Sequence, residues 1–159
     1  VYITPGSLPY AHRTPDDICV TNLQRRQVSG QRRPTSEIAL HLEIYKNRPD
    51  ICAVVHTHPV NAGTFAIARL PIPQVLETDA MGFCGEVPVA EFAPHGTPEL
   101  AKNALAALAP DKNACLLSNH GLVTAAKTLE SAVFMTKMTE DAAKMILLAR
   151  AAGYSIKEL

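Results

Sequence analysis

The chain has 159 residues, of which 47% are hydrophobic and 19% are charged. This length and composition are typical of one globular domain with a substantial core, and they exclude a disordered chain. The 15 basic and 15 acidic residues give a formal net charge of zero. Without a basic excess or a long apolar run, the sequence favours neither a nucleic-acid partner nor a membrane partner, and it predicts no membrane-spanning helix.

The first half of the chain predicts short strands, then a helix, a buried strand and a second helix. Three strands are predicted, at 1–4, 17–23 and 25–30. A helix is expected to begin at a cap on Thr35 or Ser36 and to end before Pro49. The β-branched, apolar run 51–58 predicts a central strand, and 61–70 predicts a short helix.

The second half continues this alternation after an irregular passage over 71–85. It predicts a strand at 86–92, a helix at 97–109, two strands within 113–126 joined at 119–121, and a long helix at 128–153. Alternating strands and helices with interspersed hairpins predict an α/β/α layered domain around a sheet that is not purely parallel.

Chain extent and cysteine usage add two expectations. We expect a single domain over 1–159 that lacks its N-terminal segment, because a strand already begins at Val1. The cysteines are scattered and form no C-x-x-C pair, so we interpret them as reduced, buried residues of a cytoplasmic protein. They are Cys19, Cys52, Cys84 and Cys115.

The stretch AVVHTHP (53–59) indicates a candidate metal site. Residues two apart on a strand point to the same face, so His56 and His58 are expected to project together. A catalytic zinc site commonly has three protein ligands and one open position. The alternative is that one histidine is a satisfied core residue and the other lies in a loop.

A third ligand has to come from elsewhere in the chain. His120 is the best candidate on local grounds, because it lies between two predicted strands and is followed by Gly121. His95 also precedes a glycine, but it lies just before a helix cap and is expected in an exposed loop. His41 shares a helix face with Glu37, four residues earlier.

The start of the first helix carries a candidate general base. Glu37 is the candidate, and its alternative role is only to complement the helix dipole. Two segments, PTSE (34–37) and TPGS (4–7), offer hydroxyl groups and free N–H groups that suit an anion. Together they suggest a phosphate on the substrate.

Several stretches taken together resemble the class II aldolase/adducin family. They are PTSEIALHLEIYKNRPDICAVVHTHP (34–59), ITPGSLPY (3–10), VPVAEFAPHGTPELAKNALAAL (87–108) and NACLLSNHGLV (113–123), in family order and over nearly the whole chain. The resemblance implies a three-layer α/β/α sandwich around a mixed, largely antiparallel central sheet. It also implies a homotetramer.

The resemblance assigns site residues one by one. It implies a zinc ion, or another divalent metal, held by His56, His58 and His120. It implies that Glu37 is the catalytic acid/base. It implies phosphate binding by the first turn and by the residues before the glutamate, which are Thr4, Gly6, Ser7, Thr35 and Ser36.

The implied reaction is cleavage of a C–C bond in a small hydroxy-carbonyl sugar, phosphorylated in the leading interpretation. In family aldolases the metal stabilises the enediolate left when the bond breaks. A family decarboxylase uses the same chemistry and stays open. An epimerase is less favoured, because family epimerases carry aspartate where Glu37 stands.

Two non-catalytic alternatives also stay open. Adducin-type interaction domains lack the metal histidines, which this chain keeps. A purely structural zinc site needs a fourth protein ligand, and none is convincing. The sequence therefore predicts a cytoplasmic, metal-dependent carbon–carbon lyase.

Overall fold

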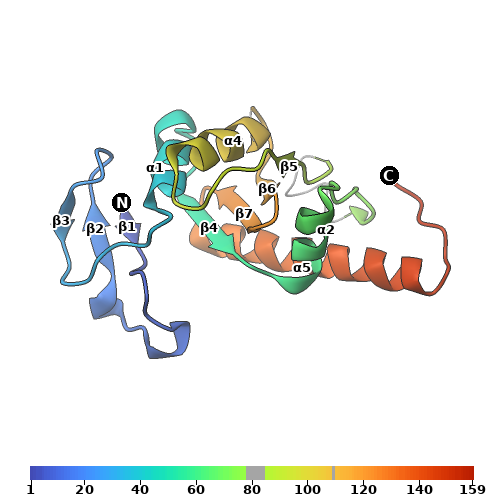
Figure 1. The fold of residues 1–159 in the computed structure, drawn as a ribbon, viewed down its shortest axis with the longest axis horizontal. Helices are drawn as coiled ribbons and strands as arrows, with labels where there is room; N and C mark the ends of the chain where they lie inside the picture. The colour runs from blue at the N-terminus through green and yellow to red at the C-terminus, as the bar shows by residue number, and fades with distance from the viewer. Residues whose placement is uncertain (78–84, 109) are drawn as a thin grey trace.

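A computed structural model of the chain describes residues 1–77, 85–108 and 110–159. The first three strands form a small antiparallel sheet at one end of the molecule, in the order β1-β2-β3 (Figure 1). They are β1 (Tyr2–Ile3), β2 (Cys19–Thr21) and β3 (Gln27–Ser29). Two short 3-10 helices, Tyr10–His12 and Pro15–Asp17, connect β1 to β2.

A second sheet of four strands lies at the centre, in the order β4-β7-β6-β5. Its strands are β4 (Ala53–Thr57), β5 (Val89–Ala90), β6 (Ala114–Leu117) and β7 (Gly121–Ala126). β7 pairs antiparallel with β4 and with β6, whereas β5 pairs parallel with β6. The central sheet is therefore mixed and largely antiparallel.

Helices cover both faces of this central sheet (Figure 1). They are α1 (Ile38–Asn47), α2 (Val60–Ala68), α4 (Pro98–Leu108) and α5 (Leu129–Ala151). Alternate strand residues point to opposite faces. Leu116 and Leu122 therefore pack in one core cluster with residues of α2 and α5, and Cys115 and Val123 pack in another with residues of α1 and α4. The predicted three-layer α/β/α sandwich is confirmed.

The structure departs from the sequence-based expectations at several points. The first three strands form their own sheet, which the strand pattern did not separate from the central one. The strand expected at 86–92 is shortened to β5. Neither Thr35 nor Ser36 is the cap residue of α1, because a turn over 35–37 makes Glu37 the residue that precedes the helix.

The cysteine expectations hold only in part. Cys19, Cys52 and Cys115 are free, but Cys52 is exposed, not buried. Cys84 lies outside the described residues, as does much of the passage expected to be irregular. None of the helices within the described ranges has both the length and the apolar character needed to cross a membrane.

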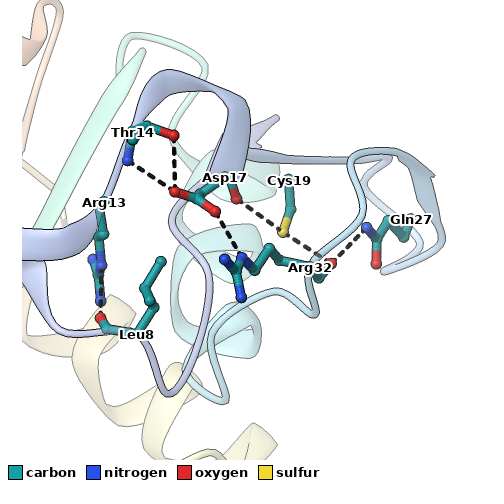
Figure 2. A network of polar contacts seen from close by, with 7 residues as sticks. All are labelled: Leu8, Arg13, Thr14, Asp17, Cys19, Gln27 and Arg32. Carbon is teal, nitrogen blue, oxygen red and sulfur yellow. Dashed lines mark hydrogen bonds and ion pairs between the residues drawn. The ribbon is translucent and has the colours of Figure 1, made fainter.

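A polar network joins the connection between β1 and β2 to the loop that leads from β3 to α1. Figure 2 shows the Asp17 carboxylate between Thr14 and Arg32. It accepts hydrogen bonds from the backbone N–H and the hydroxyl of Thr14, both at 2.9 Å, and from Arg32 Nε at 2.7 Å. The backbone hydrogen bond from Thr14, followed by the contact with Arg32, lowers the pKa of Asp17 to about 2. The Cys19 thiol also donates to the Arg32 carbonyl, at 3.2 Å.

The first turn carries backbone strain at Ser7, which has a φ of 57°. This is the left-handed region, which costs a non-glycine residue about 1–2 kcal/mol. We therefore expect Ser7→Gly to raise the free energy of unfolding by about 1 kcal/mol, measured by urea denaturation. Ser29→Gly, in the extended strand β3, is the control and should lower stability by about 0.5–1 kcal/mol. Equal changes in the free energy of unfolding of the two variants would show that the backbone at Ser7 is not strained.

Candidate metal centre

Two elements of the central sheet place the three histidines that the sequence pattern predicts as metal ligands. His56 lies in β4, and His58 follows directly after the strand ends at Thr57. His120 lies in the tight turn between β6 and β7, where its N–H donates to the Leu117 carbonyl at 3.0 Å. Because β7 pairs with β4, this turn lies beside the end of β4.

Gly121 makes this approach possible. A Cβ atom at this position would lie 2.4 Å from the Thr57 carbonyl oxygen and 2.8 Å from Cδ2 of His58. It would also lie 3.3 Å from Cε1 of His56. Only the absence of a side chain lets β7 begin against both histidines. The turn is completed by Asn119, which adopts a left-handed φ of 55°.

The three imidazole rings form one cluster. The ring centroid of His56 lies 4.8 Å from those of His58 and His120, and the rings of His58 and His120 stack at 5.1 Å. One nitrogen of each ring can be chosen so that all three lie within 4.8 Å of one another. This compactness is what a shared cation requires.

Hydrogen bonding leaves ring nitrogens of the cluster available. His56 Nδ1 lies 3.0 Å from the Leu122 carbonyl, so it carries the proton and donates to that oxygen. His56 Nε2 and His120 Nδ1 are buried and have no hydrogen-bond partner among the described residues. Buried nitrogens without partners are costly in a finished fold, and a bound cation would satisfy them.

Burial favours the neutral form of two of the three rings, those of His56 and His120. Burial lowers the pKa of His56 to about 3, against the opposing effect of the hydrogen bond to Leu122. Burial also lowers the pKa of His120, while the Glu37 carboxylate acts in the opposite direction. Neutral imidazole is the form that binds a metal ion. The residues present therefore fit a divalent cation with histidine ligands.

Glu37 lies beside this cluster, immediately before α1. Its side chain is only 8% exposed, and both carboxylate oxygens are buried without a hydrogen-bond partner in the described part of the chain. Its own N–H donates to Thr35 Oγ1 at 3.3 Å. Gly96 packs close by, since a Cβ there would lie 3.9 Å from Glu37 Oε1. Buried polar groups nearly always have a hydrogen-bond partner, so this carboxylate is a candidate functional group.

A cavity of about 400 Å³ joins the histidine cluster to Glu37. Of the residues predicted to bind phosphate, Thr4, Thr35 and Ser36 line this cavity, whereas Gly6 and Ser7 do not. The Gly6 N–H is already used, since it donates to the Arg33 carbonyl at 3.1 Å. The left-handed residue of this turn is Ser7, not Gly6.

Sequence reasoning missed part of the cavity wall. Tyr10 and Leu129 line it, and so do His41 and His95. His41 shares a helix face with Glu37, which was a usable signal, and burial lowers its pKa to about 4. Tyr10 and Leu129 come from distant parts of the chain and gave no local signal. His95 lies at the cavity but outside the three-histidine cluster.

The sequence of the chain is similar to those of known aldolases. A family model described as "Class II Aldolase and Adducin N-terminal domain" matches residues 1–147. An L-fuculose phosphate aldolase of Methanococcus vannielii is 33% identical over 91% of this chain and 77% of the relative. A 5-deoxy-D-ribulose 1-phosphate aldolase of Bacillus thuringiensis is 34% identical over 96% of this chain and 71% of the relative.

Solved structures are similar as well. An L-fuculose 1-phosphate aldolase structure superposes with a TM-score of 0.93 at 35% identity, covering 99% of this chain and 73% of that one. These three relatives are named aldolases, which are carbon–carbon lyases. The chain therefore belongs to the class II aldolase and adducin family, and its similarity to named aldolases identifies it as a carbon–carbon lyase of that family.

Proposed function

We propose that the chain is a zinc-dependent aldolase that cleaves a C–C bond in a small phosphorylated hydroxy-carbonyl sugar. The observation that carries this proposal is the cluster of three imidazoles beside a buried carboxylate. His56 and His120 present nitrogens without partners, and Glu37 lines the same cavity. This set combines metal ligands with a proton-transferring group.

The residues of the site have two proposed roles, metal binding and proton transfer. His56, His58 and His120 would hold the metal, and the lowered pKa values of His56 and His120 suit that role. A bound zinc ion supplies a Lewis acid that stabilises negative charge developing on a substrate carbonyl oxygen. The Glu37 carboxylate accepts and returns a proton at the reacting part of the substrate, because its oxygens have no competing partner among the described residues.

The phosphate end of the substrate is proposed to lie against Thr35, Ser36 and Thr4. These residues line the cavity just before α1 and at the end of β1. Hydroxyl groups and the free N–H groups at the start of a helix favour an anion. Gly6 and Ser7 belong to the proposed phosphate turn, with a supporting role, because neither lines the cavity. The names of two relatives support a ketose 1-phosphate as the substrate class.

Purified protein is expected to contain about one divalent metal per chain, and a strong chelator should remove activity that added zinc restores. The test is metal analysis followed by assay on a panel of ketose 1-phosphates and sugar-derived keto-acids. Release of an aldehyde together with a three-carbon ketone phosphate identifies an aldolase. Release of CO₂ from a keto-acid identifies a decarboxylase, and a stereoisomer without cleavage identifies an epimerase. Metal-free protein with full activity would contradict the proposal.

We also propose that the enzyme is a homotetramer of the cytoplasm, as its family resemblance implies. Exposed apolar side chains at the start of α5, Leu129, Val133 and Phe134, support contact with another subunit. Leu129 also lines the candidate cavity. Burial of these side chains in an assembly would therefore close one wall of the site. Light scattering of the purified protein measures the subunit number.

A further inference from the structure

Helix α2 begins directly after the candidate ligand His58, and its first turn has no local cap. The residue at the cap position is Pro59, whose side chain accepts no hydrogen bond. The first hydrogen bond of the helix runs from the Gly63 N–H to the Pro59 carbonyl at 2.9 Å. The N–H groups of the preceding residues therefore need partners from outside the helix.

Glu140, in the middle of α5, supplies those partners. Its Oε1 accepts hydrogen bonds from the Asn61 N–H at 3.0 Å and from Asn61 Nδ2 at 2.7 Å. Its Oε2 accepts from the Ala62 N–H at 2.8 Å. A carboxylate at a helix N-terminus is favoured by the dipole and by charge-assisted hydrogen bonds. Glu140 thus caps α2 from a position 78 residues beyond Ala62 in the sequence.

Of the three clustered histidines, His58 lies nearest in the chain to this cap. It is the exposed member of the cluster, whereas His56 and His120 are half-buried. His56 is held within β4 and by its hydrogen bond to Leu122. His58 lies after the last residue of β4 and shortly before Val60, where α2 begins. Its backbone is therefore fixed at one end by the sheet and at the other by α2.

We propose that Glu140 is a positioning residue for the metal centre: it ties the start of α2 to α5 and so fixes where His58 presents its ring. This inference rests on the proposed function. Glu140 itself is not assigned any contact with the metal or the substrate. Its effect passes through Asn61 and Ala62 to the His58–Pro59 segment.

A purely structural role makes a different prediction from a positioning role. If Glu140 only stabilises α2, its loss lowers the unfolding temperature and leaves the zinc affinity of the folded protein unchanged. If it positions His58, the folded protein binds zinc more weakly, since partners that orient metal ligands typically contribute about 10–100-fold in affinity. Zinc affinity is therefore the measurement that separates the two roles.

The experiment measures the zinc dissociation constant of the full chain by competition with a chromophoric chelator, well below the unfolding temperature. The variants are Glu140→Ala and Glu140→Gln. The matched control is Asn22→Ala, because Asn22 Oδ1 also accepts two backbone N–H groups, from Gln24 at 3.0 Å and Arg26 at 2.9 Å. Asn22 lies in the turn between β2 and β3, away from the histidines.

We expect Glu140→Ala to weaken zinc binding about 10–100-fold, Glu140→Gln to weaken it less, and Asn22→Ala to leave it unchanged. The cobalt-substituted Glu140→Ala protein should also show an altered visible absorption spectrum. If the alanine variant does not fold, the glutamine variant, which keeps the side-chain size, carries the same test. Equal zinc dissociation constants in wild type and the folded Glu140 variants would overturn the positioning role of Glu140 and leave the proposed metal centre standing. Absence of zinc binding in wild type would overturn the metal centre, and this inference with it.

Discussion

Glu37→Gln should lower turnover by about 10²–10⁴-fold while the zinc content stays unchanged. The amide keeps the shape of the side chain but cannot accept and return a proton. Because both carboxylate oxygens are buried without partners in the described residues, removing the charge should also leave the unfolding temperature unchanged or higher. A loss of activity without a loss of stability is the signature of a catalytic carboxylate.

The control for this variant is Glu99→Gln. Glu99 is an exposed acidic residue in the first turn of α4, so it complements a helix dipole without facing the cavity. If Glu37 does no more than that, the two variants should behave alike, with full activity and a small loss of stability. Steady-state kinetics on the best ketose phosphate, together with metal analysis and thermal unfolding, separate the two cases. A fully active Glu37→Gln enzyme would remove Glu37 from the proposed mechanism.

Gly121→Ala should disrupt the metal centre although it adds a single carbon atom. The new Cβ would lie 2.4 Å from the Thr57 carbonyl oxygen, which is backbone and cannot rotate away. The turn must then move from β4, and His120 moves with it. We expect a zinc affinity at least about 10-fold weaker and a free energy of unfolding lower by about 1–3 kcal/mol.

Gly63→Ala is the matched control for this substitution. Gly63 lies within α2, and its φ is not left-handed. Apart from its chain neighbours and the nearby backbone of α2 itself, a Cβ atom added there would meet no described atom within 4 Å. Alanine there should raise stability by up to about 1 kcal/mol, because glycine is a poor helix former. Urea denaturation and zinc titration of both variants test the difference. A Gly121→Ala protein with wild-type zinc affinity would show that the close approach of β7 to β4 is not required.

The layers of the fold were predictable because hydrophobic periodicity and breakers are local signals. The apolar, β-branched run 51–58 and the long helix that begins after the cap residue Thr128 were recognisable from local sequence alone. The separation of the first three strands from the central sheet was not, since strand partners depend on long-range pairing. The start of α1 was also displaced, because Thr35 forms a turn with Glu37 and does not cap the helix directly.

The candidate site also contains residues that local sequence predicts and residues that it does not. The two-residue period of a strand predicted that His56 and His58 lie on one face, and Gly121 indicated a close approach beside His120. The structure brings these rings together, while their role as zinc ligands stays a prediction. Tyr10, Leu129 and Glu140 act through contacts between segments far apart in the sequence, which no local pattern encodes.

The antiparallel pairing of β4 with β7 also bears on the order in which the protein matures. His56 pairs with Val123, far along the chain, so the third imidazole arrives beside the first two only when this distant pairing has closed. Before β7 has paired with β4, only His56 and His58 lie together, and two imidazoles bind a metal ion more weakly than three. If the three histidines bind a metal ion as proposed, complete coordination would require that β7 has already paired with β4.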